Sequence, residues 1–117
     1  MNVNEKILGL KEIVDCPVVP DIYDGTEDRY ITFTYEDERP DTCADNGVEA
    51  DVSYIQIAYF VPKTYDYMND KHRIRDYLEA NGFQGTSIRS WIDPDIIKEQ
   101  YIRHVAFETS YLESRRK

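Results

Sequence analysis

The segment 52–61 restricts the fold more than any other part of the sequence. Its residues form two alternating series, and both are rich in apolar side chains. One series is Ile55, Ile57, Tyr59 and Val61, and the other contains Val52, Tyr54 and Phe60. Alternation with a period of two predicts a β-strand, because successive side chains point to opposite faces of a sheet. A strand that is apolar on both faces is expected at the centre of a sheet or against a partner chain.

Similar alternation predicts three more strands, at residues 30–36, 87–92 and 101–112. Apolar residues that recur every three to four positions predict helices over residues 4–14 and 66–81. The resulting order is helix, strand, strand, helix, strand, strand. This order predicts an α+β fold, in which a mostly antiparallel four-stranded sheet has the helices packed on one face.

Two connections in this arrangement have distinctive sequences. Pro40 and the Asn-Gly pair at 46–47 predict an acidic loop over residues 37–50, and connections of this length tend to be functional or disordered. The Asp-Pro-Asp motif at 93–95 predicts a turn into a short helical piece that ends at Glu99.

The sequence also suggests the class of protein. No linker rich in Pro or Gly divides the chain, so we expect one domain over residues 1–117, with a flexible tail at about 113–117. We expect no membrane span, because no apolar run approaches about 18 residues. The first residues lack a basic region and a cleavage site, so we expect no secretion signal. Two cysteines, Cys16 and Cys43, are too few for a disulfide framework and suit a reducing compartment.

The negative charge is concentrated in the first half of the chain. Residues 1–50 hold 13 acidic and 4 basic residues, whereas residues 51–117 hold 10 of each. Within the first half, residues 36–51 hold seven acids and one base. Such a surface repels phosphate backbones, which argues against sequence-specific binding of nucleic acid.

The acidic segment does not match a known calcium-binding loop. An EF-hand needs oxygen ligands at its positions 1, 3 and 5 before a glycine at position 6. Aligning Gly47 with that glycine puts Ala44 at a ligand position and Ser53 where the bidentate glutamate belongs. We therefore expect no metal and no other cofactor. The alternative is a weak, non-specific divalent site formed by Asp41, Asp45 and Glu49.

A catalytic site is not expected either. Cys16 and Cys43 could supply a nucleophile, and His72 and His104 could supply a base. No motif brings a cysteine next to a histidine, and the sequence contains no glycine-rich phosphate loop. The sequence therefore predicts a protein that is not an enzyme and has no catalytic residues.

The aromatic residues predict a contact between subunits. Trp91 lies out of phase with Ile88 and Ile92, so it points to the sheet face opposite these isoleucines, together with Arg89. Exposed Trp, Tyr and Arg side chains are typical of interface hot spots. The alternative is a partly buried surface tryptophan. The candidate interface residues are Tyr54, Phe60, Arg89 and Trp91.

Several short runs, in this order along the chain, resemble one family. They are residues 18–25 (VVPDIYDG), 29–33 (RYITF), 44–46 (ADN), 82–83 (GF) and 101–108 (YIRHVAFE). Together they resemble small tail-completion proteins of long-tailed phages and prophages, which act as tail terminators or in tail-to-head joining. The resemblance covers about residues 5–113, and none of these runs is a catalytic signature.

The resemblance implies a structural role in the tail or neck of a virion that is assembled in the cytoplasm of a bacterial host. Proteins of this kind form a ring, typically a hexamer, that ends polymerisation of the tail tube and joins tail to head. The implied partners are other copies of the chain, the tail tube protein and the head–tail connector protein. DNA passes through such a ring without specific binding, and no membrane is involved.

In such a ring, the acids predict a lumen or a ring face that does not hold DNA, because like charges keep phosphates from adhering. The candidate acids are Asp37, Glu38, Asp41, Asp45 and Glu49. A second hypothesis is an acidic inhibitor that mimics DNA, although mimics usually spread acids over a whole face and residues 51–117 are neutral. A third, a small metal-dependent hydrolase, depends on the acidic segment alone.

Overall fold

The computed structural model describes residues 2–43, 48–96 and 100–114. Its helices are α1 (Val3–Leu8), α2 (Leu10–Val14) and α3 (Met68–Ala80). Its strands are β1 (Val18–Pro20), β2 (Tyr30–Cys43), β3 (Val48–Pro62), β4 (Phe83–Asp95) and β5 (Gln100–Ser114). The molecule is elongated, with extents of 55 × 24 × 22 Å.

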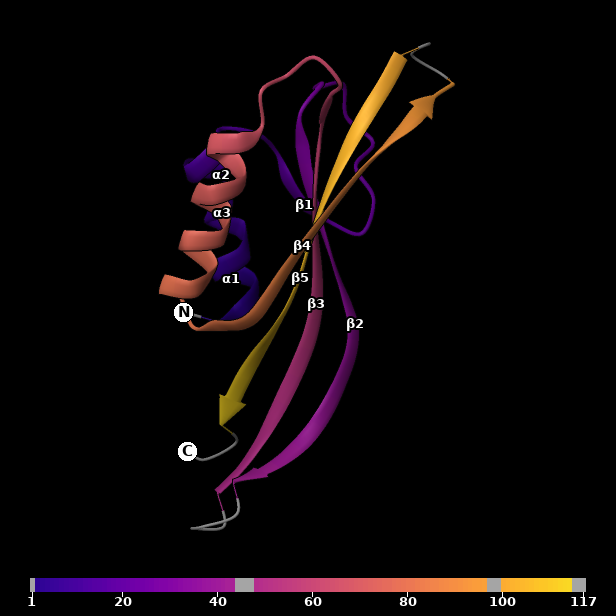
Figure 1. The fold of residues 1–117 in the computed structure, drawn as a ribbon. Coiled ribbons are helices and arrows are strands. Elements are labelled where there is room, and N and C mark those ends of the chain that lie inside the picture. The colour runs from indigo at the N-terminus through magenta and orange to yellow at the C-terminus, as the bar shows by residue number, and fades with distance from the viewer. Residues whose placement is uncertain (1, 44–47, 97–99, 115–117) are drawn as a thin grey trace.

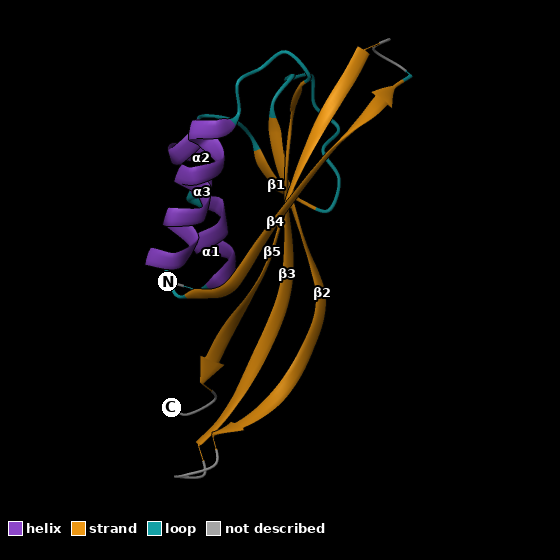
Figure 2. Ribbon diagram, viewed as in Figure 1, coloured by secondary structure: helices purple, strands orange, loops and turns teal. Residues whose placement is uncertain are grey.

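The strands form one mixed sheet in the order β1-β2-β3-β5-β4. β1 is parallel to β2, and the other neighbouring strands are antiparallel. β3 is the middle strand, as its two apolar series predict. The helices lie over one face of the sheet and leave the other face uncovered by helix (Figures 1 and 2).

The hydrophobic core lies between the helices and the sheet. On the side of the sheet, one alternating series from each of the inner strands β2, β3 and β5 forms the core. The register aligns these residues in rows such as Ile31, Tyr59 and Val105. The fully buried side chains of the core are Ile7, Leu10, Ile31, Ile55, Ile57, Tyr59, Val61, Ile74, Leu78, Val105 and Phe107. Burial of each such side chain contributes about 1.5–3 kcal/mol, so this layer holds most of the stabilising contacts.

The helix ends follow from local sequence. The side chain of Asn2 accepts a hydrogen bond from the backbone N–H of Glu5 (2.9 Å), which starts α1. The predicted helix over 4–14 is divided at Gly9 into α1 and α2. α3 ends before Gly82, whose φ of 93° is a conformation that favours glycine.

The prediction of a four-stranded α+β fold is wrong. The described chain is predominantly β, with five strands, and β1 makes the sheet mixed. β1 has only three residues, too few to show a period, and its pairing depends on β2. The backbone N–H of Ile31 donates to the carbonyl of Pro17, and that of Asp21 donates to the carbonyl of Phe33.

The described parts of the acidic segment, residues 37–43 and 48–50, are strand and not the loop that the sequence predicts, and residues 44–47 lie outside the described residues. β2 continues to Cys43 and β3 begins at Val48, so the two strands extend past the helices as a long hairpin (Figure 1). The strand register shifts at Glu36, between Tyr35 and Asp37. We refer to the paired residues 37–43 and 48–54 as the β2–β3 arm.

A second hairpin projects from the opposite end of the sheet (Figure 1). β4 continues through Pro94 to Asp95, so the predicted turn at 93–95 is wrong, and the predicted helical end at 97–99 lies outside the described residues. Proline is tolerated here because β4 is an edge strand, where one side of the backbone needs no partner. β5 continues to Ser114, so residues 113–114 of the predicted tail belong to a strand, and residues 115–117 lie outside the described residues.

Candidate interaction surface on the open face of the sheet

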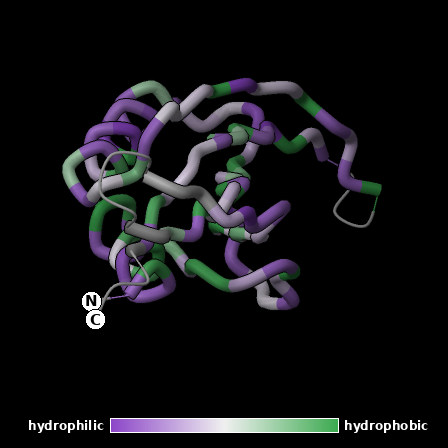
Figure 3. Tube along the Cα trace, turned by 90° about the horizontal axis from the view of Figure 1, so that it is seen from below, coloured by the Kyte–Doolittle hydropathy of each residue, from purple (hydrophilic) through white to green (hydrophobic). Residues whose placement is uncertain are grey.

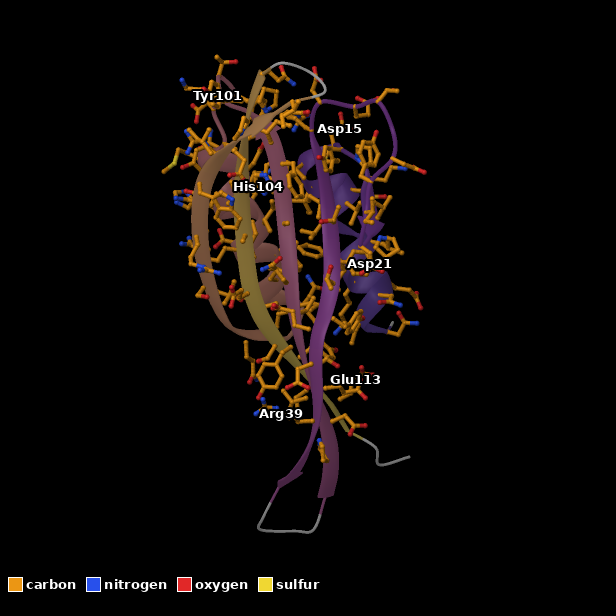
Figure 4. All side chains as sticks on the ribbon, turned by 90° about the vertical axis from the view of Figure 1, so that its right-hand side faces the viewer. Asp15, Asp21, Arg39, Tyr101, His104 and Glu113 are labelled. Atoms are coloured by element: carbon orange, nitrogen blue, oxygen red, sulfur yellow. The ribbon has the colours of Figure 1, made fainter. Side chains whose placement is uncertain are left out.

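The face of the sheet away from the helices carries the second series of each inner strand. Figure 4 looks onto this open face, and Figure 3 shows from the end that the helices lie on one side only. Tyr54 and Phe60 of β3 belong to this face, whereas Ile55 and Tyr59 point into the core. The open face is therefore a surface of regular structure without a helix over it.

A row of aromatic rings crosses the open face. The register places Tyr30 of β2, Phe60 of β3, His104 of β5 and Trp91 of β4 side by side. The ring centroids of consecutive members lie 4.7, 4.4 and 5.2 Å apart, and Tyr23 extends the row by stacking on Tyr30 at 4.4 Å. Such cross-strand aromatic contacts stabilise a sheet and also present large apolar surface.

Polar groups hold the end of this row at β4. The indole Nε1 of Trp91 donates to Asp93 Oδ2 (2.9 Å), and the Nε2 of His104 lies 3.4 Å from the same oxygen. Burial lowers the pKa of His104, and the negative charge of Asp93 opposes this change. Arg89 donates to Glu108 (2.7 Å) and lies 6.0 Å from the Trp91 ring. Trp91 is thereby fixed in orientation while 39% exposed.

The row borders a shallow hollow near the end of β4. Its volume is about 430 Å³. Its lining residues are Tyr30, Phe60, Asp93, Pro94, Asp95, Ile96, Ile102 and His104. Ile96 is largely exposed beside it, so the hollow and this side chain together form an apolar patch with acidic neighbours.

A second cluster lies at the base of the β2–β3 arm. Arg39 donates to Asp37 (2.7 Å), and its guanidinium lies 5.6 Å from the ring of Tyr54. The hydrogen bond from Arg39 lowers the pKa of Asp37 below its usual value. Tyr54 remains 40% exposed. This cluster gives the start of the arm one cation among its acids.

The four candidate interface residues all belong to the open face. Phe60, Arg89 and Trp91 lie together around the aromatic row, whereas Tyr54 lies apart, near Arg39. The sequence did not predict Tyr23, Tyr30 and His104 as members of this row. Alternation places Tyr30 and His104 on strand faces, and Tyr23 lies in the segment between β1 and β2. The row depends on the register between strands, which no local pattern shows.

Four of the five candidate acids, Asp37, Glu38, Asp41 and Glu49, belong to the β2–β3 arm. Asp37 is exposed, and Glu38 Oε2 accepts a hydrogen bond from Ser53 (3.4 Å). Asp41 and Glu49 belong to β2 and β3, and Asp45 lies outside the described residues. Among the described residues, no group of three or more acids, histidines and cysteines could hold a metal ion.

The residues considered for catalysis lie apart. Cys16 is buried, and burial raises its pKa to about 11, whereas a nucleophilic cysteine needs a lowered pKa. His72 is exposed on α3, and His104 belongs to the aromatic row. Within the described ranges, no helix has the length and hydropathy needed to cross a bilayer.

A buried polar cluster beneath the helices was not predicted. Tyr59 and Tyr65 each donate a hydrogen bond to Asp70 Oδ2 (2.7 and 2.8 Å). Arg29 donates to the Tyr59 hydroxyl (2.8 Å) and to the carbonyl of Val14 (3.1 Å), and lies 3.7 Å from Asp70. The cluster joins β3, α3, the end of α2 and the segment before β2, so we assign it a structural role.

No protein-family model matches the chain, and no curated protein matches its sequence. A solved structure with a similar fold is a chain from the "Virion of native gene transfer agent (GTA) particle". The two chains are 12% identical with a TM-score of 0.54, and the match covers 96% of this chain and 91% of that chain. At this identity, the similarity shows a shared fold along nearly the whole length of both chains.

Proposed function

We propose that this chain is a structural protein of a phage-like particle and has no catalytic activity. The observation that supports this most directly is the fold that it shares, almost end to end, with a chain of a gene transfer agent virion. The chain would then work in a virion, together with other proteins of the particle. The short runs that resemble tail-completion proteins lead to the same proposal independently.

Within such a particle, the chain would form a ring that ends polymerisation of the tail tube and joins the tail to the head. A ring needs head-to-tail contacts, so each subunit must present two different interaction surfaces. The two flanks of the sheet and the open face with its aromatic row are candidates for such surfaces. The tail tube protein and the head–tail connector protein would contact the two ends of the ring.

The acids of the β2–β3 arm fit a place at the lumen or at a face of this ring. Asp37 and Glu38 are exposed at the start of the arm, opposite β3 residues that still pair with β5. A negatively charged lumen would let DNA pass without binding, because its phosphates would be repelled.

Deleting the gene from the phage or prophage that carries it tests the proposal. After induction, negative-stain electron microscopy of the lysate should show overlong or unattached tails beside heads filled with DNA. Overlong tails would indicate termination, and tails of normal length that remain unattached would indicate joining. Normal virions would contradict the proposal and would favour an acidic inhibitor that mimics DNA, whose binding to a basic protein should weaken strongly with salt.

A further inference from the structure

The two flanks of the sheet differ in charge. Strand order puts β1 and β2 at one edge and β4 at the other. Figure 4 shows this separation, with Asp21 on the flank opposite β4. Residues 21–28 after β1 (DIYDGTED) contain four acids and no base, whereas residues 71–75 of α3 (KHRIR) contain three bases and a histidine. Surfaces of opposite charge on opposite flanks are complementary between neighbouring copies.

Two of the three basic residues of α3, Lys71 and Arg75, lie on the side of the helix toward Arg103 of β5, whereas Arg73 lies on another side. The Tyr77 hydroxyl donates to the Lys6 carbonyl (2.7 Å), so that side of α3 faces α1. Tyr67 and Lys71 lie on a different side of the helix. The Lys71 ammonium lies 5.8 Å from the Tyr67 ring, and the guanidinium of Arg103 lies 4.8 Å from it.

Apolar side chains are exposed among these cations. Ile92 of β4 lies directly opposite Arg103 in the register and is 38% exposed. Met68, in the first turn of α3, is 44% exposed. Arg75 lies one turn after Lys71 on the same side of α3. We define the basic patch as Tyr67, Met68, Lys71, Arg75, Ile92 and Arg103.

The basic patch contains a buried donor without an acceptor. The Nε of Arg103 is buried and has no hydrogen-bond partner among the residues that the structure describes. Leaving such a donor unsatisfied costs free energy, and the cost is larger for a charged group. The buried Nε is out of reach of a neighbouring copy, so a carboxylate from outside the subunit would interact with the charge of this guanidinium and not with that atom.

The flank at β1 offers a matching surface. Ile22 is 81% exposed, and Asp21, Asp24 and Glu27 are exposed around it. The Tyr23 hydroxyl accepts a hydrogen bond from the backbone N–H of Glu27 (2.9 Å), which closes this segment into a compact turn. We define the acidic turn as residues 21–27. It presents an apolar side chain surrounded by acids, whereas the basic patch presents apolar side chains beside three cations, of which Arg75 also pairs with Asp76 (3.4 Å).

We propose that the acidic turn of one copy binds the basic patch of the next copy. In this contact Ile22 packs against Met68 and Ile92, and the acids face Lys71, Arg75 and Arg103. Because the two surfaces lie on opposite flanks, the contact is head-to-tail and repeats around a ring. The inference rests on the proposed function, since it specifies how the ring of subunits would be held together.

Charge reversal tests this contact in the purified, full-length protein. Sedimentation velocity at low ionic strength should show concentration-dependent self-association of the wild-type chain, which added salt weakens. The double variant Lys71→Glu/Arg75→Glu and the double variant Asp24→Lys/Glu27→Lys should each raise the dissociation constant at least about tenfold. Ile22→Ser should weaken association without changing the net charge.

Mixing the two double variants is the decisive experiment. Lys71→Glu/Arg75→Glu has two acidic flanks, and Asp24→Lys/Glu27→Lys has two basic flanks. Copies of the same variant therefore repel one another. Alternating copies restore opposite charges at every contact, so the mixture should assemble although neither variant does so alone. Glu5→Lys/Glu12→Lys, on α1 and α2, is the matched control and should associate like the wild type. Circular dichroism checks that every variant is folded.

A wild-type chain that remains monomeric at every concentration would overturn the proposed contact, as would a mixture that fails to assemble. Loss of association in the control variant would also overturn the proposed contact, because the weaker association of the double variants would then come from their net charge. These outcomes are separate from the gene deletion. Normal virions after deletion would contradict the tail role and leave the contact intact, whereas a monomeric chain with defective virions would contradict the contact alone.

Discussion

The middle of the sheet and the β2–β3 arm are parts of the same strands, yet different surroundings support them. In the middle, Ile57 and Phe107 are fully buried beneath the helices. On the arm, Asp37, Glu38 and Arg39 are exposed, and β2 and β3 extend past the helical layer (Figure 1). Stability should therefore reside in the covered part, and the arm is free to carry charge for contacts outside the subunit.

The largest effect should come from the covered region. Phe107→Ala should lower the free energy of unfolding by about 3–5 kcal/mol, because it leaves a cavity in the core. Trp91→Ala, on the open face, should cost about 1 kcal/mol or less, since Trp91 is 39% exposed. Urea unfolding followed by circular dichroism measures both. Equal losses would show that the open face stabilises the subunit as much as the core does.

The buried polar cluster should give the next largest effect. Asp70→Ala should cost about 3 kcal/mol, because Tyr59 and Tyr65 lose the acceptor that they share and Arg29 loses the nearby negative charge. Asp70→Asn keeps an oxygen acceptor and should cost less. Thermal unfolding of the two variants distinguishes these effects. Unfolding of both variants at the wild-type temperature would mean that the cluster adds nothing to stability.

Alkaline pH should destabilise the covered region. Burial raises the pKa of Cys16 from 9.0 to about 11, so between these values the unfolded chain releases a proton that the folded chain retains. The free energy of unfolding therefore does not change through Cys16 below pH 9, and it falls by about 2 kcal/mol as the pH rises toward 11. Burial also raises the pKa of Tyr59, which acts in the same direction. The free energy of unfolding, measured from pH 8 to 11, should fall less steeply with pH in Cys16→Ala than in Cys43→Ser. Equal slopes would contradict the assignment of this pH dependence to Cys16.

The arm should give the smallest effect on stability and a clear effect on function. Reversing three acids as Asp37→Lys, Glu38→Lys and Asp41→Lys should leave the melting temperature close to that of the wild type. The variant should assemble into particles but eject DNA poorly, because a cationic lumen would bind phosphates. Infectivity and DNA release from purified particles measure this effect. Unchanged infectivity would count against a place at the lumen.

The sequence by itself determined which face of the inner strands β2, β3 and β5 is buried beneath the helices. The series containing Ile31 and Phe33, and the series containing Ile57 and Tyr59, point into the core as their alternation predicts. A period of two is a local property of the chain, because neighbouring side chains point to opposite faces whatever the strand pairs with. The end of α3 before Gly82 is local in the same sense.

The tertiary structure alone decided which strands pair and how far they extend. Hydrogen bonds from neighbouring strands determine the parallel pairing of β1, the strand order and the length of the β2–β3 arm. Residues 37–43 and 48–50, which the sequence predicts as loop, are strand for this reason. The aromatic row and the cluster around Asp70 join residues that are distant in sequence. Register and packing bring these residues together, and neither is encoded in any single segment.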